Sequence, residues 1–243
     1  MKRIRWDRSQ GRPEPIKLLN LVPERENGEP LVDMREQAPS LRLLRPSVIP
    51  YCRQTVAQMA ERAASLLPKG LHLGLVEAWR PIERQQRIYD FMWRSAQQAY
   101  PDRDFRSLRR TVNRLVAPTD QKAPPGHCTG AALDVWLVDD QGEPVDVNSP
   151  FDRFQASRTY TQGLAPEAWR NRMVLVEAML AVGFSNCRDE WWHYSYGDAG
   201  WAVRTGASEC FYGLASLPAA LYEDAELLHV ESMKERSNPF LSA

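Results

Sequence analysis

The sequence lacks a surplus of either charge: Lys plus Arg and Asp plus Glu each number 31 among its 243 residues. A general nucleic-acid-binding protein is expected to be basic, because much of its affinity comes from neutralising phosphates. One local basic group is present, and we interpret it as a solvated helix face: Arg103, Arg106, Arg109 and Arg110. The charge balance therefore argues against nucleic acid as a partner.

Long apolar runs are also missing. No segment approaches the roughly 18 apolar residues of a membrane-spanning helix, and residues 1–10 carry no apolar run of signal-peptide length. Cysteine is scarce, and the four that occur form no Cys-x-x-Cys pair: Cys52, Cys128, Cys187 and Cys210. A disulfide framework is not expected in such a chain. We expect a cytoplasmic protein with reduced, structural thiols and no membrane partner.

The order of the predicted elements indicates one domain that mixes helices and strands. Apolar residues recur at helical spacing in four segments: 55–67, 81 to beyond 92, 166–182 and 218–233. Strand alternation or extended aromatic sequence marks three others: 71–77, 131–138 and 184–196. We expect loops and edge strands over 1–50, and a basic, irregular stretch before Ala123. Because no repeat or linker interrupts the chain, it is predicted to be a single α+β domain.

Histidine is scarce as well, and two of the four histidines lie in segments with other ligand-type residues. The first segment is His127-Cys-Thr-Gly-Ala-Ala-Leu-Asp134, and the second is Glu190-Trp-Trp-His193. A catalytic zinc ion needs three such ligands and an open position for water. Two imidazoles and one carboxylate meet that need, and the ion lowers the pKa of its water from about 15.7 toward about 7.

Two more groups are required for zinc-assisted hydrolysis. A carboxylate that is not a ligand must accept the proton of the water, and Glu190 lies three residues before His193. A fixed cation must face the oxygen of the attacked carbonyl, and Arg80 follows a predicted strand. Spacing alone leaves open that the histidines are structural.

The spacing also constrains the local geometry. On an uninterrupted strand, His127 and Asp134 would point to opposite faces, because their separation is odd. We therefore expect a turn or bulge near Thr129 and Gly130. Glu190 and His193 also have an odd separation, so a local twist is expected there.

The other candidates are interpreted as structural residues. His72 alternates with leucines in a predicted strand, and His229 lies in the acidic C-terminal helix, where we expect it at the surface. Cys128 is adjacent to His127, and adjacent residues rarely both reach one ion, so we assign it to packing.

Three segments resemble VanX-type D-alanyl-D-alanine dipeptidases: Trp79-Arg80-Pro81, His127-x-x-Gly130-x-Ala132-x-Asp134 and Glu190-Trp191-Trp192-His193. That group belongs with the zinc D,D-peptidases, whose fold is shared by the Hedgehog signalling domain. The resemblance implies a central, mainly antiparallel sheet flanked by helices. The matching motifs span 51–211, which we expect to be the catalytic core of one domain over 1–243, with an N-terminal segment (1–50) packed on it and a C-terminal extension (212–243).

The resemblance further implies an enzyme with one Zn²⁺ per chain that hydrolyses D-alanyl-D-alanine or a closely similar small dipeptide. It assigns these roles: His127, Asp134 and His193 as metal ligands, Glu190 as general acid/base, Arg80 as the holder of the oxyanion, and Asp152 as the partner of the substrate ammonium. One position departs from the family, which usually has Ser where this chain has Pro125. Because proline offers neither a hydroxyl nor an N–H, substrate preference is expected to differ.

Two alternatives remain at this point. The first is a D,D-carboxypeptidase acting on longer peptidoglycan peptides, which the apparent lack of a signal peptide disfavours. The second is a non-catalytic protein in which zinc organises a binding surface. Glu190 and Arg80 argue against the second, because a structural zinc site is closed and needs no acid/base.

Overall fold

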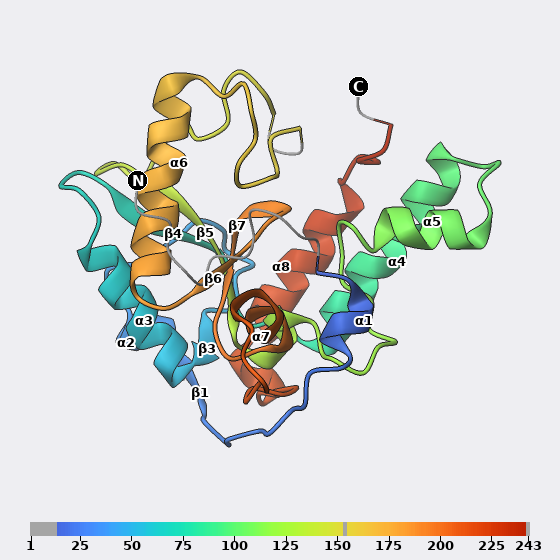
Figure 1. Cartoon of the computed structure of the whole chain (residues 1–243), viewed down its shortest axis with the longest axis horizontal. Helices are drawn as coiled ribbons and strands as arrows, with labels where there is room; N and C mark the ends of the chain where they lie inside the picture. The colour runs from blue at the N-terminus through green and yellow to red at the C-terminus, as the bar shows by residue number, and fades with distance from the viewer. Residues whose placement is uncertain (1–13, 153–154, 242–243) are drawn as a thin grey trace.

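A five-stranded sheet lies at the centre of the fold, in the order β2-β4-β5-β7-β6 (Figure 1). Its strands are β2 (Arg42–Leu43), β4 (His72–Glu77), β5 (Ala132–Val138), β6 (Ser185–Cys187) and β7 (Glu190–Ser195). The short edge strand β2 runs parallel to β4, and every other pair in this sheet is antiparallel. The computed structural model describes residues 14–152 and 155–241. The predicted α+β class with a mainly antiparallel central sheet is confirmed.

Two helices cover one face of the sheet, α3 (Gln54–Ser65) and α6 (Pro166–Ala181), seen on the left in Figure 1. The main core forms between these helices and the alternate strand residues Leu133, Val135 and Leu137, all fully buried. Because successive residues of a strand point to opposite faces, this burial turns Asp134 toward the other face. The apolar pattern of β5 thereby sets which side of the sheet carries the site.

The opposite side of the molecule is built from α4 (Ile82–Ala99), α5 (Phe105–Val112), α7 (Ala199–Thr205) and α8 (Glu223–Lys234). A smaller apolar cluster joins α4 to α5: Met92, Ala96, Leu108 and Val112. The remaining elements are short: α1 (Ile16–Leu19), β1 (Leu31–Asp33), α2 (Met34–Gln37), β3 (Tyr51–Arg53), η1 (Gly126–Thr129) and η2 (Ala219–Leu221). β1 and β3 pair as a separate antiparallel ribbon.

Most predicted elements are confirmed to within a few residues, and three expectations change. Residues 1–50, expected to hold loops and edge strands, also contain the short helices α1 and α2. The stretch before Ala123, expected to be irregular, contains α5, which begins at a side-chain cap from Asp104. The extended segment 184–196 is a hairpin, because β6 and β7 are joined by a turn. The expectation for residues 1–10 falls outside the described residues.

His229 was expected at the surface, and this prediction is wrong: only 5% of the residue is exposed. The acidic pattern of α8 suggested a solvated helix, but α8 packs along α4 and buries the imidazole there. His72 fits its structural interpretation, since it is half-buried and lies 2.9 Å from Asp140 Oδ1. All four cysteines are free, as expected.

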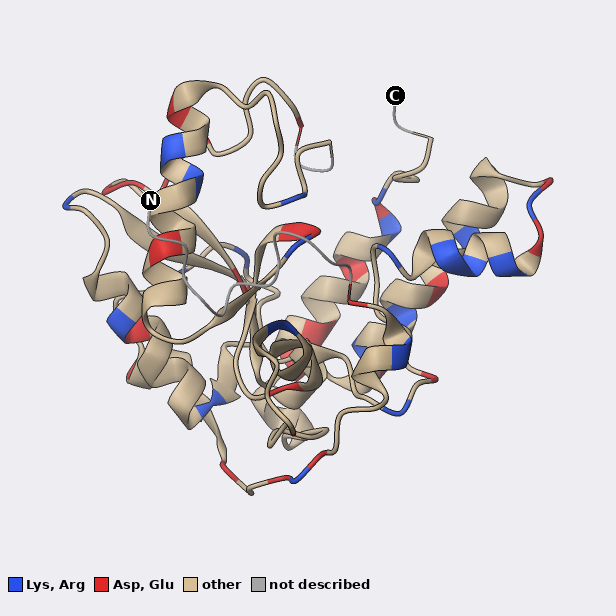
Figure 2. Ribbon diagram, viewed as in Figure 1, with Lys and Arg blue, Asp and Glu red and all other residues tan. Residues whose placement is uncertain are grey.

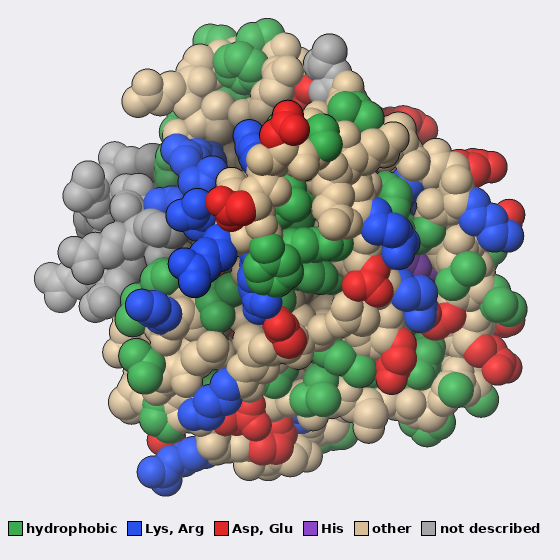
Figure 3. Space-filling view, turned by 90° about the vertical axis from the view of Figure 1, so that its right-hand side faces the viewer, with side chains coloured by type: hydrophobic (Ala, Val, Ile, Leu, Met, Phe, Trp, Pro, Cys, Tyr) green, Lys and Arg blue, Asp and Glu red, His purple; other side chains and the backbone are tan. Residues whose placement is uncertain are grey.

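The basic group at 103–110 belongs to α5 and the turn before it. Arg103 lies 3.7 Å over the ring of Tyr100, and Arg109 pairs with Asp120 at 2.9 Å. Figure 3, which views this side of the molecule, shows Lys and Arg side chains with Asp and Glu among and around them. These contacts agree with a solvated helix face. Among the described residues, no helix has the length and apolarity required to cross a membrane.

Candidate metal centre and active site

A row of polar side chains crosses three adjacent strands. Glu77 on β4 lies directly opposite Asp134 on β5, which lies directly opposite His193 on β7. Directly opposed residues of neighbouring strands share one face of a sheet. Strand pairing thus brings together Asp134 and His193, which lie 59 positions apart in the sequence.

A tight turn delivers His127 to this row. The 3₁₀ turn η1 ends at Gly130, whose φ of 73° is left-handed, and a Cβ there would lie 2.2 Å from Leu31 Cδ2. The left-handed conformation favours glycine at this position, and any larger residue would also displace the Leu31 side chain. The predicted turn near Thr129 and Gly130 is confirmed. The backbone N–H of Arg80 donates to the carbonyl of His127 at 3.1 Å, which ties the turn to the end of β4.

A bulge in the β6–β7 hairpin resolves the parity of Glu190 and His193. Asn186 pairs with Tyr194, and the next residue of β6, Cys187, pairs with Glu190, so β7 carries extra residues at this point. The side-chain amide of Asn186 donates to the carbonyls of Glu190, Trp191 and His193, at 3.4, 3.3 and 3.1 Å. The local irregularity expected here is confirmed, and one buried amide holds it.

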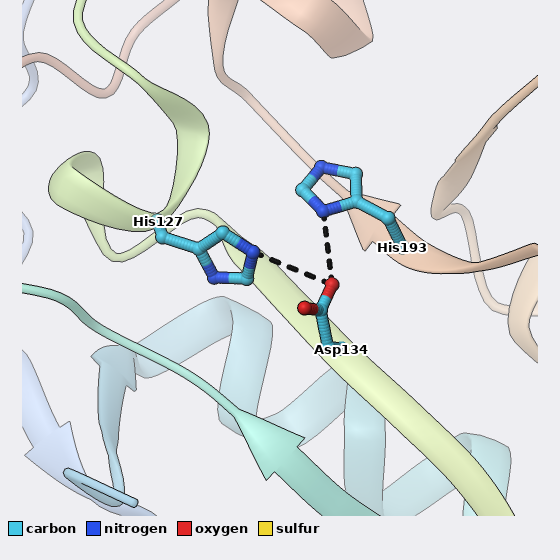
Figure 4. A group of neighbouring side chains, drawn as sticks. All are labelled: His127, Asp134 and His193. Atoms are coloured by element: carbon cyan, nitrogen blue, oxygen red, sulfur yellow. Dashed lines mark hydrogen bonds and ion pairs between the residues drawn. The ribbon is translucent and has the colours of Figure 1, made fainter. Parts of the chain in front are cut away.

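The three predicted ligands converge on one point (Figure 4). Asp134 Oδ1 lies 3.3 Å from His127 Nε2 and 3.1 Å from His193 Nδ1, and all three ligand atoms lie within 4.8 Å of one another. A tetrahedral zinc ion with bonds of about 2.0–2.1 Å would separate its ligand atoms by roughly 3.3–3.4 Å. The residues therefore fit a metal ion of this size and ligand preference.

The orientation of His127 is fixed from behind. Its Nδ1 lies 2.9 Å from the carbonyl oxygen of Ala78, which leaves Nε2 to face Asp134. A hydrogen bond from the distal nitrogen to a carbonyl is typical of metal-ligating histidines, because it sets the tautomer and the ring orientation. His127 is buried, and the two imidazole rings meet edge to face at 4.9 Å.

Electrostatics keep the carboxylate of the group ionised. Burial alone would raise the pKa of Asp134, but the charge of His127 and hydrogen bonds from both imidazoles hold the pKa well below its ordinary value. Burial also raises the pKa of the neighbouring Cys128 thiol to about 12. Cys128 is therefore a neutral thiol at neutral pH, in agreement with its assignment to packing.

Arg80 lies beside this group in a buried ion-pair network. Its Nη1 donates to Gln85 Oε1 at 2.6 Å and its Nη2 to Glu77 Oε2 at 3.2 Å. Burial would lower the pKa of Arg80, but the charges of Glu77 and Asp134 hold the pKa above its ordinary value. Arg80 Nε is buried and has no hydrogen-bond partner among the described residues.

The structure places the other two predicted residues outside the converging group. Glu190 is the first residue of β7 and is partly buried. Asp152 is exposed on the loop between β5 and α6, and its carboxylate accepts from the N–H of Gln155 at 2.9 Å. That loop is tied to the start of β7, because the N–H of Trp191 donates to the carbonyl of Ser157 at 2.8 Å. Asp152 thus lies on a loop fastened next to Glu190.

Sequence reasoning missed several residues that shape the site. Glu77 stands in the same row as the ligands, yet only the pairing of β4 with β5 shows this. Asn186 is an ordinary polar residue by sequence, and its role depends on a bulge. Arg84 on α4 pairs with Glu77 at 3.4 Å and is 1% exposed. Its position four residues after Arg80 was a usable signal, since both residues flank the same predicted helix start.

Comparisons with known proteins found a matching family model and two relatives. A family model described as D-ala-D-ala dipeptidase, peptidase family M15, matches residues 51–210. A D-alanyl-D-alanine dipeptidase of Synechocystis sp. is 27% identical over 227 residues, covering 77% of this chain and 90% of the relative. One of Escherichia coli is 27% identical over 143 residues, covering 58% of this chain and 64% of the relative, just under two thirds of its length. The chain therefore belongs to the D-Ala-D-Ala dipeptidase family of peptidases.

Proposed function

We propose that this chain is a zinc-dependent dipeptidase that hydrolyses D-alanyl-D-alanine. The observation that carries the proposal is the convergence of two imidazoles and one carboxylate, His127, His193 and Asp134, within 4.8 Å. Two neutral nitrogen ligands and one anionic oxygen ligand leave a divalent ion with a net charge of about +1, which suits a catalytic site. The names of the two relatives support the dipeptide as substrate.

The chain's own residues divide the chemistry among them. A bound zinc ion supplies a site at which water loses a proton near neutral pH and a carbonyl is polarised. Glu190 accepts the proton of the attacking water and passes it to the leaving amine. Arg80 donates hydrogen bonds to the oxygen that becomes negatively charged in the tetrahedral state. The buried Arg80 Nε, which has no partner among the described residues, supports this assignment.

Substrate recognition is proposed to involve the loop that carries Asp152. Its carboxylate would pair with the free ammonium of the dipeptide, and the anchoring of that loop to β7 supports a position near Glu190. Pro125, buried at the start of the His127 turn, replaces the usual family serine and removes one hydroxyl from the site. A preference among small D-dipeptides that differs from that of the serine-bearing relatives is the expected consequence.

The decisive experiment is the substitution Glu190→Gln. It keeps the shape of the side chain but removes the base, so turnover of D-alanyl-D-alanine should fall by at least about 100-fold. Zinc content, measured by atomic absorption, should stay at one ion per chain, because Glu190 is not a proposed ligand. Release of D-alanine by the zinc-loaded protein, and its loss after treatment with a strong chelator, are measured in parallel.

Asp189→Asn is the matched control, since Asp189 is the adjacent carboxylate and pairs with Arg188 at 2.6 Å. This variant should keep normal turnover. A zinc-replete wild-type protein that leaves D-alanyl-D-alanine intact would refute the substrate assignment. Faster cleavage of a cell-wall pentapeptide than of the dipeptide would instead indicate a D,D-carboxypeptidase.

A further inference from the structure

We propose that Glu226, on the C-terminal helix α8, is a positioning residue that holds Arg80 in place through Arg84 and Glu77. The inference rests on the proposed role of Arg80 in holding the oxyanion. It extends the active site to a helix that lies beyond residues 51–210, the segment matched by the family model.

The four residues form a chain of alternating charges. Arg80 Nη2 donates to Glu77 Oε2 at 3.2 Å, and the second oxygen of Glu77 lies 3.4 Å from Arg84 Nη1. Arg84 Nε in turn donates to Glu226, whose other carboxylate oxygen pairs with Arg87. Glu77 therefore lies between two guanidinium groups, and its position depends on both of them.

Arg84 is fixed from several directions, and α8 supplies two of its contacts. Its Nη2 donates to the carbonyl of Ala225 on α8 at 3.0 Å, and its Nη1 donates to the carbonyl of Ser47 at 2.9 Å. In Figure 1 α8 runs beside α4, and in Figure 2 its acidic bands lie near basic bands of α4. The docking of α8 thus determines where the Arg84 guanidinium sits.

Because these four charged side chains are largely buried, their ion pairs matter energetically. The side chain of Arg84 is 1% exposed, that of Arg80 13%, that of Glu77 15% and that of Glu226 18%. Removing one partner of a buried ion pair leaves an uncompensated charge, and the remaining partners then move to recover solvent or other acceptors. Loss of the Glu226 charge should allow Arg84 to move toward Glu77. The ion pair between Glu77 and Arg80 should then change its geometry.

The expected result is a loss of Arg80 orientation without loss of the metal site. Among the described residues, Glu226 pairs with none of the three converging ligands, and three successive ion pairs separate it from Arg80. A displacement of about 1 Å at an oriented catalytic group reduces turnover on the order of 10- to 100-fold. Because the oxyanion forms only in the transition state, kcat should fall by this factor while KM changes little.

The test is a double-mutant cycle on the zinc-loaded full chain. Glu226→Gln should lower kcat 10- to 100-fold in the wild-type background and have no further effect in an Arg80→Ala background. A purely structural role of Glu226 would give the same loss in both backgrounds and would overturn the inference. Glu231→Gln is the matched control, because it removes a carboxylate from the same helix, at a position where the side chain pairs with the exposed Lys234.

A second readout does not depend on catalysis. In ¹⁵N-labelled metal-free protein, the Nη2–H signal of Arg80, assigned by its disappearance in Arg80→Lys, should be protected from hydrogen exchange, because Nη2 donates to Glu77. Glu226→Gln should raise its exchange rate at least 10-fold, and Glu231→Gln should leave the rate unchanged. An unchanged rate in Glu226→Gln would overturn the inference, whatever the activity.

The two proposals fail separately. A wild-type protein without dipeptidase activity refutes the proposed function, while the exchange measurement still reports whether Glu226 holds Arg80. Normal wild-type activity with an unchanged kcat in Glu226→Gln refutes only the positioning role. If Glu226→Gln does not fold, Glu226→Asp serves in both measurements, since it keeps the charge but shortens the reach to Arg84.

Discussion

At the scale of single residues, the buried His229 shows how surroundings set the protonation of an imidazole. It lies near Arg84, Arg87 and Arg236. Burial first and the repulsion of Arg84 next lower the pKa of His229 to about 4, with Glu77 opposing them. His229, which the pattern of its helix placed at the surface, is therefore a buried and neutral residue.

This surrounding predicts a pH dependence of stability. The unfolded chain binds a proton at His229 near its ordinary pKa of 6.5, while the folded protein resists it until about pH 4. Stability should be complete above pH 6.5 and fall as the pH drops from 6.5 to about 4, because protons favour the unfolded chain. Urea unfolding of wild type and His229→Gln across this range checks it: the variant should lose less stability. Equal slopes of stability against pH in wild type and His229→Gln would contradict the assignment.

At the scale of elements, the bulged hairpin β6–β7 decides how His193 faces Asp134. The hairpin depends on one side chain, since Asn186 donates to three carbonyls of β7 and accepts from Thr159 Oγ1 at 2.5 Å. The orientation of His193 toward Asp134 therefore depends on the stability of this hairpin.

Asn186→Ala should therefore weaken both the fold and the metal site. Three carbonyls lose a buried donor, so the free energy of unfolding should fall by about 1–3 kcal/mol, and zinc affinity should fall roughly 10- to 100-fold, as for other supporting contacts of ligands. Urea unfolding and competition with a chromophoric chelator measure the two effects. Asn171→Ala is the control, since Asn171 donates to a single carbonyl, that of Asp146, at 2.9 Å. Unchanged zinc affinity in Asn186→Ala would show that the bulge does not orient His193.

The same hairpin marks the limit of prediction from sequence. Periodicity located α3, α6 and β5 because their apolar spacing is a local property of the chain. It located neither α5, whose residues are mostly polar, nor the turn between β6 and β7. The ligand residues were named by resemblance, and their convergence follows from strand pairing between distant segments, which spacing cannot specify. Glu77 stayed hidden for the same reason, and Glu226 because its contact with Arg84 depends on how α8 packs beside α4.

At the scale of the whole molecule, the three candidate ligands link segments that precede α6 in the sequence to β7, which follows it. An ion that binds only the folded state stabilises it by mass action. At free zinc 100 times above the dissociation constant, the gain in unfolding free energy is about 2.7 kcal/mol. Metal removal should therefore lower the Tm by several degrees.

Differential scanning calorimetry with and without zinc measures this shift. Asp134→Asn, which removes the one anionic member of the group, should abolish most of the difference between the two melting curves. A Tm that is equal in wild-type samples with and without zinc would contradict metal binding by the folded chain.

Pairing of β5 with β7 also has a consequence for how this chain can diverge. An ion held by Asp134 and His193 would fasten both ends of the 59-residue interval between them, much as a crosslink does. The entropy of closing such an interval rises only slowly, by about 0.6 kcal/mol for each doubling of its length. Insertions and deletions in the loops around α6 should therefore be tolerated at little thermodynamic cost. The surface of this interval can then change in evolution while the ligands of the candidate metal site stay the same.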